Sequence, residues 1–241
     1  MQNLEGKTIV FFGATGGIGE SVCQEFQEAG ANLVLVARSQ DKLAKLKEEL
    51  GGQNIAAISA DATSLTEVQK VFRESIEKFG EIDAVVISVG TWQRTSLANS
   101  PQEIIDMNEK LDASIAKPVI VVGSVAQEVL REQGRGVIFH MSSHAAITYL
   151  EGNLAYASAK AKATRFILNL GGELQGTGVS TCDLRIMIVD TPQNRKAFPK
   201  FSKAKWAKAV QPADIARFIS KGINNPKIPA SKLFKSGIIT K

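Results

Sequence analysis

Gly13-Ala14-Thr15-Gly16-Gly17-Ile18-Gly19 is the stretch that decides the fold of this chain. It follows the apolar run 7–12, typical of a buried strand, and opens a helical pattern with Ile18, Val22 and Phe26 on one face. Such a turn presents unpaired helix N–H groups and the positive end of the helix dipole to a phosphate. The strand before it and the helix after it favour a dinucleotide site over a plain connection between two elements.

The glycines of this stretch each serve a separate physical need. Gly13 permits the tight turn off the strand, Gly17 lets the backbone approach a pyrophosphate, and Gly19 lets the helix pack closely on the strand.

Short apolar segments alternate with longer amphipathic ones along the chain, and they predict strands and helices in turn. Strands are expected at 7–12, 33–37, 55–60, 84–87, 136–141 and 178–189, and helices at 41–50, 64–79, 101–133 and 154–174, with an interruption near Pro118. This order predicts an α/β fold: a Rossmann-type, doubly wound parallel sheet in three α/β/α layers, with ligands at the carboxyl ends of the strands.

The length and composition favour a single domain over residues 1–241, since 44% of the 241 residues are hydrophobic and can form one substantial core. Residues 192–211 are bounded by prolines and rich in lysine and aromatic residues, and we expect them to form a mobile substrate lid. No apolar run approaches transmembrane length and the first residues lack a signal-peptide pattern, so no membrane association is expected.

Cys23 and Cys182 fall within a helical and a strand pattern, which favours buried apolar side chains over a disulfide framework or a metal cluster. A cytoplasmic location fits this cysteine usage, and no metal is expected. His140, at an alternate position of a strand, is interpreted as structural. The net charge of +5 suits an anionic ligand, but a solvated basic surface is preferred to nucleic-acid binding.

Arg38 follows the strand 33–37, some twenty residues after the glycine turn, with Ser39 next to it. In dinucleotide-binding units this position reads the adenosine ribose, with an acid for NAD and a base for NADP. A guanidinium group can hold a 2′-phosphate with two hydrogen bonds. Arg38 therefore favours NADP(H) over the alternative of a surface arginine at a strand end.

Ser143, Tyr156 and Lys160 are the candidate catalytic residues. Ser143 ends the strand that begins near 136, at the edge of the sheet where ligands are expected. Tyr156 and Lys160 are four residues apart and share one helix face, so the ammonium can lie near the phenol. A nearby cation favours the phenolate and lowers the pKa of the tyrosine from about 10 towards working pH. Such a phenol can exchange a proton with a carbonyl or alcohol oxygen.

With these motifs together, the chain resembles the short-chain dehydrogenase/reductase family from residue 7 to about Phe218. The resemblance rests on the glycine turn, on Asp61, on the catalytic set above and on Asp190-Thr191-Pro192. It implies hydride transfer from the cofactor, Tyr156 as acid or base, Ser143 polarising the carbonyl, and Lys160 also holding the nicotinamide ribose.

The resemblance implies cofactor contacts along the whole ligand edge. Asp61 and Ala62 would lie by the adenine, and Val189 and Thr191 by the nicotinamide end. The full implied set for NADP(H) is Gly13, Thr15, Gly16, Gly17, Ile18, Gly19, Arg38, Ser39, Asp61, Ala62, Ser88, Gly90, Tyr156, Lys160, Val189 and Thr191.

The chain also departs from the family pattern. Ser114 stands where a helix asparagine usually completes a proton-relay tetrad, and Ile186-Met187 stand where Pro-Gly usually follows the sixth strand. Ser114 is counted with the catalytic set, but a hydroxyl is shorter than a carboxamide. We therefore expect less organised proton resupply.

The favoured function is an NADP(H)-dependent oxidoreductase acting on a small-molecule carbonyl/alcohol pair. The alternatives are a catalytically decayed NADP(H)-binding regulatory or scaffold protein of the same fold, and another reaction at the same site such as epimerisation. The family resemblance implies a homodimer or homotetramer formed through the two long helices.

Overall fold

Strands and helices alternate along the chain as the apolar pattern predicts. The computed structural model describes residues 2–225 and 227–234. Its strands are β1 (Thr8–Phe12), β2 (Asn32–Ala37), β3 (Ile55–Ser59), β4 (Ala84–Ile87), β5 (Gly136–Ser143), β6 (Val179–Ile186) and β7 (Ser231–Phe234). Its α-helices are α1 (Gly17–Glu28), α2 (Gln40–Leu50), α3 (Leu65–Phe79), α4 (Pro101–Leu111), α5 (Lys117–Gln133), α6 (Leu154–Glu173), α7 (Pro192–Ala197), α8 (Lys203–Trp206) and α9 (Pro212–Asn224). A π-turn, η1 (Asp112–Ala116), joins α4 to α5, and a 3₁₀ turn, η2 (His144–Ala146), follows β5.

Within the described residues the strands form one parallel sheet in the order β3-β2-β1-β4-β5-β6-β7. The chain builds the sheet outward from β1 to β3, then crosses to β4 and builds outward the other way. The predicted doubly wound α/β fold is confirmed. Ligands of such sheets bind where the strand order reverses, which here lies between the carboxyl ends of β1 and β4.

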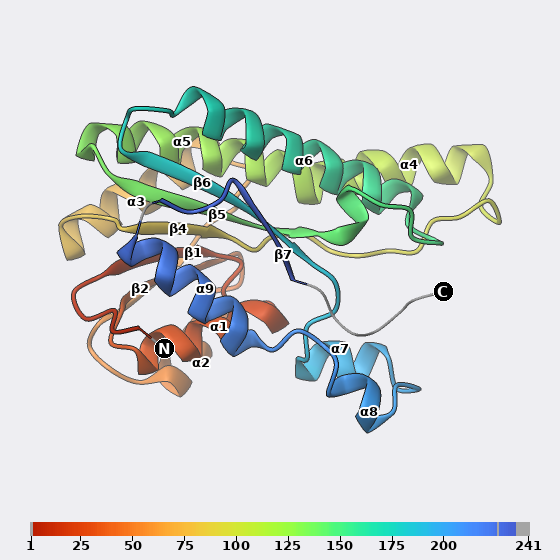
Figure 1. Cartoon of the computed structure of the whole chain (residues 1–241), viewed down its shortest axis with the longest axis horizontal. Coiled ribbons are helices and arrows are strands. Elements are labelled where there is room, and N and C mark those ends of the chain that lie inside the picture. The colour runs from red at the N-terminus through yellow and green to blue at the C-terminus, as the bar shows by residue number, and fades with distance from the viewer. Residues whose placement is uncertain (1, 226, 235–241) are drawn as a thin grey trace.

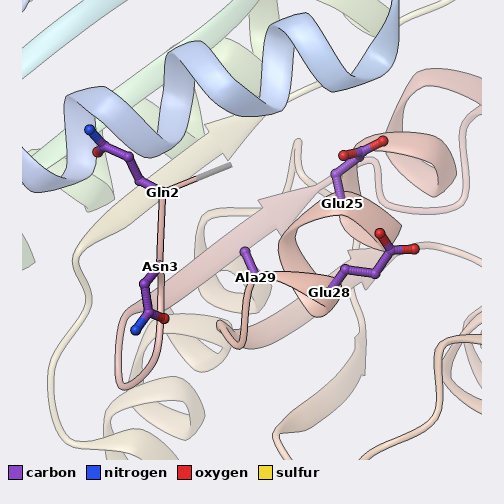
Figure 2. Close-up of a pocket in the computed structure, with 5 residues that line it drawn as sticks. All are labelled: Gln2, Asn3, Glu25, Glu28 and Ala29. Atoms are coloured by element: carbon purple, nitrogen blue, oxygen red, sulfur yellow. The ribbon is translucent and has the colours of Figure 1, made fainter.

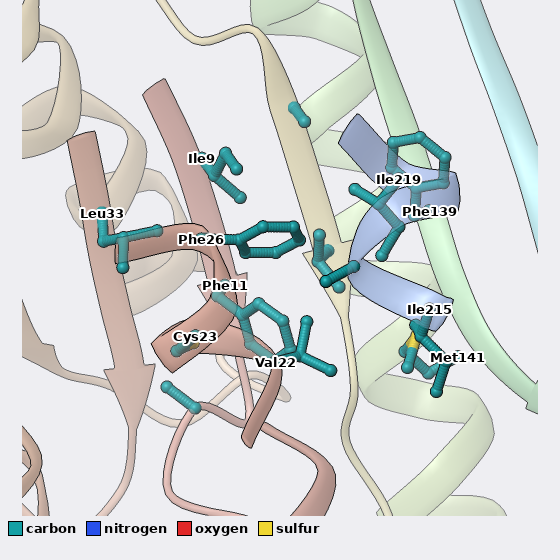
Figure 3. Packing of buried hydrophobic residues seen from close by; sticks show 14 of the residues in the cluster. Ile9, Phe11, Val22, Cys23, Phe26, Leu33, Phe139, Met141, Ile215 and Ile219 are labelled. Atoms are coloured by element: carbon teal, nitrogen blue, oxygen red, sulfur yellow. The ribbon is translucent and has the colours of Figure 1, made fainter. Parts of the chain in front are cut away.

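Helices cover both faces of the sheet, with α1, α2 and α9 on one face and α3, α4, α5 and α6 on the other (Figure 1). Alternate residues of β1 serve the two faces: Ile9 and Phe11 pack towards α1 and α9, and Val10 and Phe12 pack towards α3 and α5. Figure 3 shows the first of these cores, where Phe26 of α1 packs beside Phe11. Burial on both sides explains why these strands are continuously apolar in sequence.

Both cysteines are free and fully buried, Cys23 in α1 and Cys182 in β6. Burial raises the pKa of the Cys182 thiol to about 12, so it stays protonated. The interpretation of both as small apolar side chains is confirmed.

The long helix is interrupted near Pro118, as predicted, by η1. Proline lacks an N–H and its ring crowds the carbonyl of the preceding turn. A π-turn widens the backbone just before Pro118, which then sits in the first turn of α5, where no intrahelical donor is needed.

The combined helix Pro101–Gln133 is long and apolar enough to span a membrane, with a mean hydropathy of 1.4 over its most apolar window. The expectation that no stretch approaches this length was therefore wrong. Half of that window is buried, and Leu111, Ile115, Val119 and Val122 pack in the core on the α6 side of the sheet. A core helix satisfies the same criterion of length and composition.

Residues 192–211 are more ordered than the predicted excursion. They form α7 and α8, and Trp206 is buried against Phe198 and Phe201 in a small core of their own. A bridge between Val189 and Val210 closes the segment at its base. Whether it moves as a lid stays a prediction.

Gly171→Ala and Gly172→Ala form a matched pair that tests the packing of α6 on β6. Alanine is favoured over glycine in a helix by about 0.8–1 kcal/mol. An added Cβ at Gly172 meets no atom within 4 Å, so Gly172→Ala is expected to raise the free energy of unfolding. An added Cβ at Gly171 would collide with Oγ1 of the buried Thr181, so Gly171→Ala should lower it by about 1–3 kcal/mol. Urea denaturation measures both, and equal effects would contradict this packing.

Candidate active site at the carboxyl ends of the strands

The glycine turn lies at the switch point and is too crowded for side chains. Gly13 has a φ of 87°, and an added Cβ there would collide with the backbone oxygen of Ser88 after β4. An added Cβ at Gly19 would collide with the backbone oxygen of Gly13. Gly13 and Gly19 thus have the tight turn and the close helix packing that the sequence predicts.

The remaining residues of the turn surround the start of α1. Gly16 is the N-cap residue without a side-chain cap, so the first N–H groups of α1 face outward. Thr15 is half-buried beside it, and Ile18 packs partly buried against the core.

Gln193 is a residue at this site that the sequence analysis missed. Its Oε1 accepts a hydrogen bond of 2.9 Å from the backbone N of Gly17, 176 residues away in the chain. An added Cβ at Gly17 would lie 2.7 Å from that oxygen. A side-chain carbonyl therefore occupies the position where a phosphate oxygen would accept from the same N–H. No sequence signal links two residues so far apart.

The base of α7 holds Gln193 in this position. Thr191 is buried, and its Oγ1 accepts from the backbone N of Asn194 at 3.2 Å, which caps α7. Asp190 receives two hydrogen bonds from Arg195, of 2.6 and 2.8 Å. Val189 and Thr191, implied as nicotinamide-side residues, therefore lie on the segment that also carries Gln193 to the glycine turn.

Arg38, Ser39 and Asp61 lie together at the ends of β2 and β3. Ser39 caps α2 through its Oγ, which accepts from the backbone N of Lys42 at 3.4 Å, so an anion here would also meet a helix N-terminus. The backbone N and hydroxyl of Thr63 donate to Asp61 at 2.8 and 2.9 Å. These bonds, together with the charge of Arg38, hold the pKa of Asp61 below its usual value. Ala62 follows, half-buried.

The turn after β4 lies beside the glycine turn, at the switch point between β1 and β4. The backbone N of Ser88 donates to the oxygen of Phe12 at 2.9 Å. Gly90 has a φ of 124°, and an added Cβ would lie 2.8 Å from Ile115 in η1. Ser88 and Gly90 are thus placed between the glycine turn and η1.

Ser143 and Tyr156 meet at the end of β5. Ser143 is buried, and its Oγ accepts from the backbone N of Ala145 at 3.2 Å. Burial raises the pKa of Tyr156, and a side-chain hydrogen bond with Ser143 acts in the opposite direction. The structure therefore brings together the two hydroxyls that the sequence assigned to one site.

Lys160 lies one helical turn beyond Tyr156, and the pKa of the phenol is raised, not lowered as predicted. Its Nζ donates to the backbone oxygen of Met141 at 2.9 Å. Burial lowers the pKa of Lys160 to about 8, while the charge of Asp183 acts against this fall. The expectation that a neighbouring cation brings Tyr156 towards working pH was wrong for this arrangement, because burial of the phenol dominates and raises its pKa.

Ser114 lies in η1, and its hydroxyl is used locally. Its Oγ donates to the backbone oxygen of Leu111 at 3.3 Å. This is the usual bond of a helical serine to the preceding turn, and it directs the hydroxyl along the helix.

One hollow on the described part of the chain lies away from the strand ends. It has a volume of about 420 Å³ and is lined by Gln2, Asn3, Glu25, Glu28 and Ala29 (Figure 2). It lies at the last turn of α1, whereas the glycine turn lies at its first, about 18 Å away at 1.5 Å per residue. Its two carboxylates would repel a phosphate, so it is not the predicted cofactor site.

Known proteins of the same architecture match nearly the whole chain. The structure superimposes with a TM-score of 0.83 on a short-chain glucose/ribitol dehydrogenase from Brucella melitensis, covering 97% of this chain and 96% of that one at 24% identity. It gives a TM-score of 0.80 with a 7α-hydroxysteroid dehydrogenase complexed with NADH and 7-oxo glycochenodeoxycholic acid, covering 98% and 94% at 22% identity. A 3-ketoacyl-(acyl-carrier-protein) reductase from Brucella melitensis, complexed with NADH, gives 0.82, covering 98% of both chains at 20% identity. At these identities the likeness establishes the fold.

Sequence comparison supplies the family. An uncharacterised oxidoreductase of Staphylococcus saprophyticus is 28% identical over 233 residues, covering 94% of each chain. One from Staphylococcus aureus strain MRSA252 is 26% identical over 227 residues, covering 94% of this chain and 95% of that one. The family model described as short chain dehydrogenase matches residues 7–201. This chain, with its glycine turn at the switch point and its serine, tyrosine and lysine at the end of β5, belongs to the short-chain dehydrogenase/reductase family of oxidoreductases.

Proposed function

We propose that this protein is an NADP(H)-dependent oxidoreductase that interconverts a carbonyl and an alcohol, with Tyr156 as general acid or base. The observation that carries the proposal is the meeting of Ser143, Tyr156 and Lys160 at the end of β5, on the same sheet edge as the glycine turn. A proton donor and a hydride donor for one carbonyl must lie close together. Tyr156 and the glycine turn are both at the carboxyl ends of the strands, which supports this pairing.

Several residues fit a nicotinamide dinucleotide. The N–H of Gly17 already donates to a side-chain oxygen, that of Gln193. This supports the proposal that it can donate to a pyrophosphate oxygen. Arg38 and the start of α2 offer positive charge for a 2′-phosphate. The bound dinucleotide would supply the hydride for reduction, or accept it in oxidation.

The protein side chains would bind the substrate oxygen and transfer its proton. In reduction, Tyr156 gives its hydroxyl proton to the oxygen of the carbonyl, and Ser143 donates a hydrogen bond to the same oxygen. The ammonium of Lys160 stabilises the phenolate left on Tyr156. An ammonium has three donors, so Lys160 can keep its bond to Met141 and still donate to a ribose hydroxyl.

A catalytically decayed NADP(H)-binding protein is the second candidate. The bond from Ser114 to Leu111 favours it, because that hydroxyl is committed to the helix and not directed towards Lys160. Intact Ser143, Tyr156 and Lys160 favour the enzyme.

A screen of NADPH oxidation against diverse ketones and aldehydes, paired with direct NADPH binding, separates the two. The panel should include a steroid ketone and a β-ketoacyl thioester, the compound classes named for two structural neighbours. Turnover of any member supports the enzyme, and tight binding without turnover on all members supports the decayed protein. A cytoplasmic location, and a homodimer or homotetramer through α4–α5 and α6, remain part of this proposal.

Arg38→Asp should abolish the preference for NADPH over NADH. A hydrogen bond to a charged group contributes about 1.5–3 kcal/mol, or roughly 10- to 150-fold in affinity. We expect the wild-type protein to bind NADPH more tightly than NADH by a factor in this range, and Arg38→Asp to remove the difference. Dissociation constants of both cofactors for both proteins measure it. Equal wild-type affinities would refute the assignment of Arg38.

Tyr156→Phe should abolish most turnover and leave cofactor affinity nearly unchanged. The variant keeps the ring but loses the proton, and general acid–base catalysis typically contributes about 10²–10⁴-fold. Tyr149→Phe is the matched control, since Tyr149 is 83% exposed and is the only other tyrosine in the chain. kcat and the NADPH dissociation constant are the readouts, and a wild-type kcat for Tyr156→Phe would remove that residue from the mechanism.

Gln193→Ala should tighten dinucleotide binding, because it frees the N–H of Gly17. A neutral hydrogen bond has a net value of about 0.5–1.5 kcal/mol, which corresponds to roughly 2- to 10-fold in affinity. Gln24→Ala on α1, which removes an exposed bond to Glu28, is the control and should change nothing. Weaker NADPH binding by Gln193→Ala in a titration would mean that Gln193 serves as a phosphate ligand itself.

A further inference from the structure

A buried polar network lies beneath α6, next to the candidate catalytic lysine, and the mechanism above does not use it. It consists of His140 and Ser142 on β5, Asp183 and Arg185 on β6, and Thr164 on α6. His140 and Asp183 are fully buried, as are most of their neighbours on this face of the sheet. Burying ionisable groups is costly unless they are paired, so such a cluster needs a physical reason.

Asp183 is the centre of the network. Its Oδ1 accepts from His140 Nδ1 at 2.9 Å and from Thr164 Oγ1 at 3.1 Å, and its Oδ2 accepts from Arg185 Nε at 3.0 Å. Although burial alone would raise the pKa of Asp183, these bonds hold it below the usual value, so the group is a carboxylate. The Thr164 hydroxyl has one proton and donates it to Asp183. In the 2.6 Å bond between Ser142 and Thr164, the donor is therefore Ser142.

The network joins the turn of α6 that carries Lys160 to the sheet. Tyr156, Lys160 and Thr164 are spaced by four residues and lie along one face of α6. Their partners are on the last residues of β5: Tyr156 meets Ser143, Lys160 meets the oxygen of Met141, and Thr164 meets Ser142. Three successive helical turns are therefore fastened to one strand end.

Asp183 supplies a negative charge at the buried end of the row formed by Tyr156, Lys160 and Thr164. Among the described residues, Asp183 on β6 and His140 on β5 interact with the charge of Lys160, and Tyr156 lies one turn away on the same helix. β4 (Ala84–Ile87) carries no titratable side chain, and Asp112 of η1 is paired with Lys162 at 2.7 Å on the exposed side. Burial lowers the pKa of His140, with Lys160 acting in the same direction, so the imidazole is neutral and Asp183 is the anion that opposes the burial of the amine.

We propose that Asp183 is a positioning residue that keeps the amine of Lys160 charged and in place beside Tyr156, with His140, Thr164 and Arg185 holding its carboxylate. This inference rests on the proposed function for its catalytic meaning, because Lys160 matters through Tyr156. The charge effect itself belongs to the protein without cofactor or substrate. His140 is structural, as the sequence analysis interprets it, but the carboxylate that it supports acts on Lys160.

The test measures the titration of Lys160 directly in the full chain. Lysine labelled with ¹³C reports protonation through its Cε shift, and Lys160→Arg identifies the resonance. The wild-type midpoint is expected near pH 8. Because an opposite charge at close range shifts a pKa by about 1–3 units, Asp183→Asn should lower the midpoint by about one unit. Arg185→Gln removes one of the donors that hold the Asp183 carboxylate and should lower the midpoint by a smaller amount; the Arg185 side chain is 19% exposed and lies at the edge of the network.

Asp83→Asn is the matched control. Asp83 is also a buried carboxylate, paired with Lys7 at 3.0 Å and Arg135 at 2.9 Å, but it lies at the amino end of β4. This variant should unfold more easily and leave the midpoint of Lys160 unchanged, which separates lost stability from lost charge.

An unchanged midpoint in a folded Asp183→Asn protein would overturn the proposal. If Asp183→Asn does not fold, Arg185→Gln decides alone, and an unchanged or raised midpoint there rejects the idea. Since no substrate is used, a negative carbonyl screen leaves this result intact, and a failed titration leaves the proposed reaction intact.

Discussion

No side chain fits between Gly13 and the backbone oxygen of Ser88, and much of the ligand edge depends on that close approach. It brings the turn after β1 against the turn after β4, at the point where the strand order reverses. The chain must then turn into α1 at once, and Gly19 lets α1 return onto the same turn. The outward N–H of Gly17 is a consequence. The position proposed for the phosphates is therefore set by backbone packing.

The arrangement of the candidate catalytic residues depends on a different contact, the packing of α6 on β5. Bonds from Tyr156 to Ser143 and from Lys160 to Met141 join regular elements, so no loop determines the geometry of the candidate acid and its lysine. Loop residues lie around this arrangement. Trp92 donates from Nε1 to Asn153 at 2.8 Å, and Gln193 comes from the segment after β6. In the proposed reaction the proton-transfer groups would therefore lie on regular elements, and loops would contact the substrate.

The sequence predicted what depends on local pattern. β4 was expected at 84–87 and lies there, because its apolar run is bounded by Asp83 and Ser88. α9 was missed although its signals were present: Pro212 at the first turn, and Ile215, Ile219 and Ile223 at four-residue spacing. The partners of Gly17 and Lys160 could not have been predicted. One is a side chain 176 residues away, and the other is a backbone oxygen, which no residue type encodes.

Burial acts in opposite directions on the two candidate catalytic groups, and this explains why a third charge is needed. Removing a phenol and an ammonium from water favours the uncharged form of each, so the pKa of Tyr156 rises and that of Lys160 falls to about 8. A neutral amine could not stabilise a phenolate. The carboxylate of Asp183 opposes the fall and is itself stabilised by three hydrogen bonds. The carboxylate of Asp183 thus partly offsets the cost of burying Lys160.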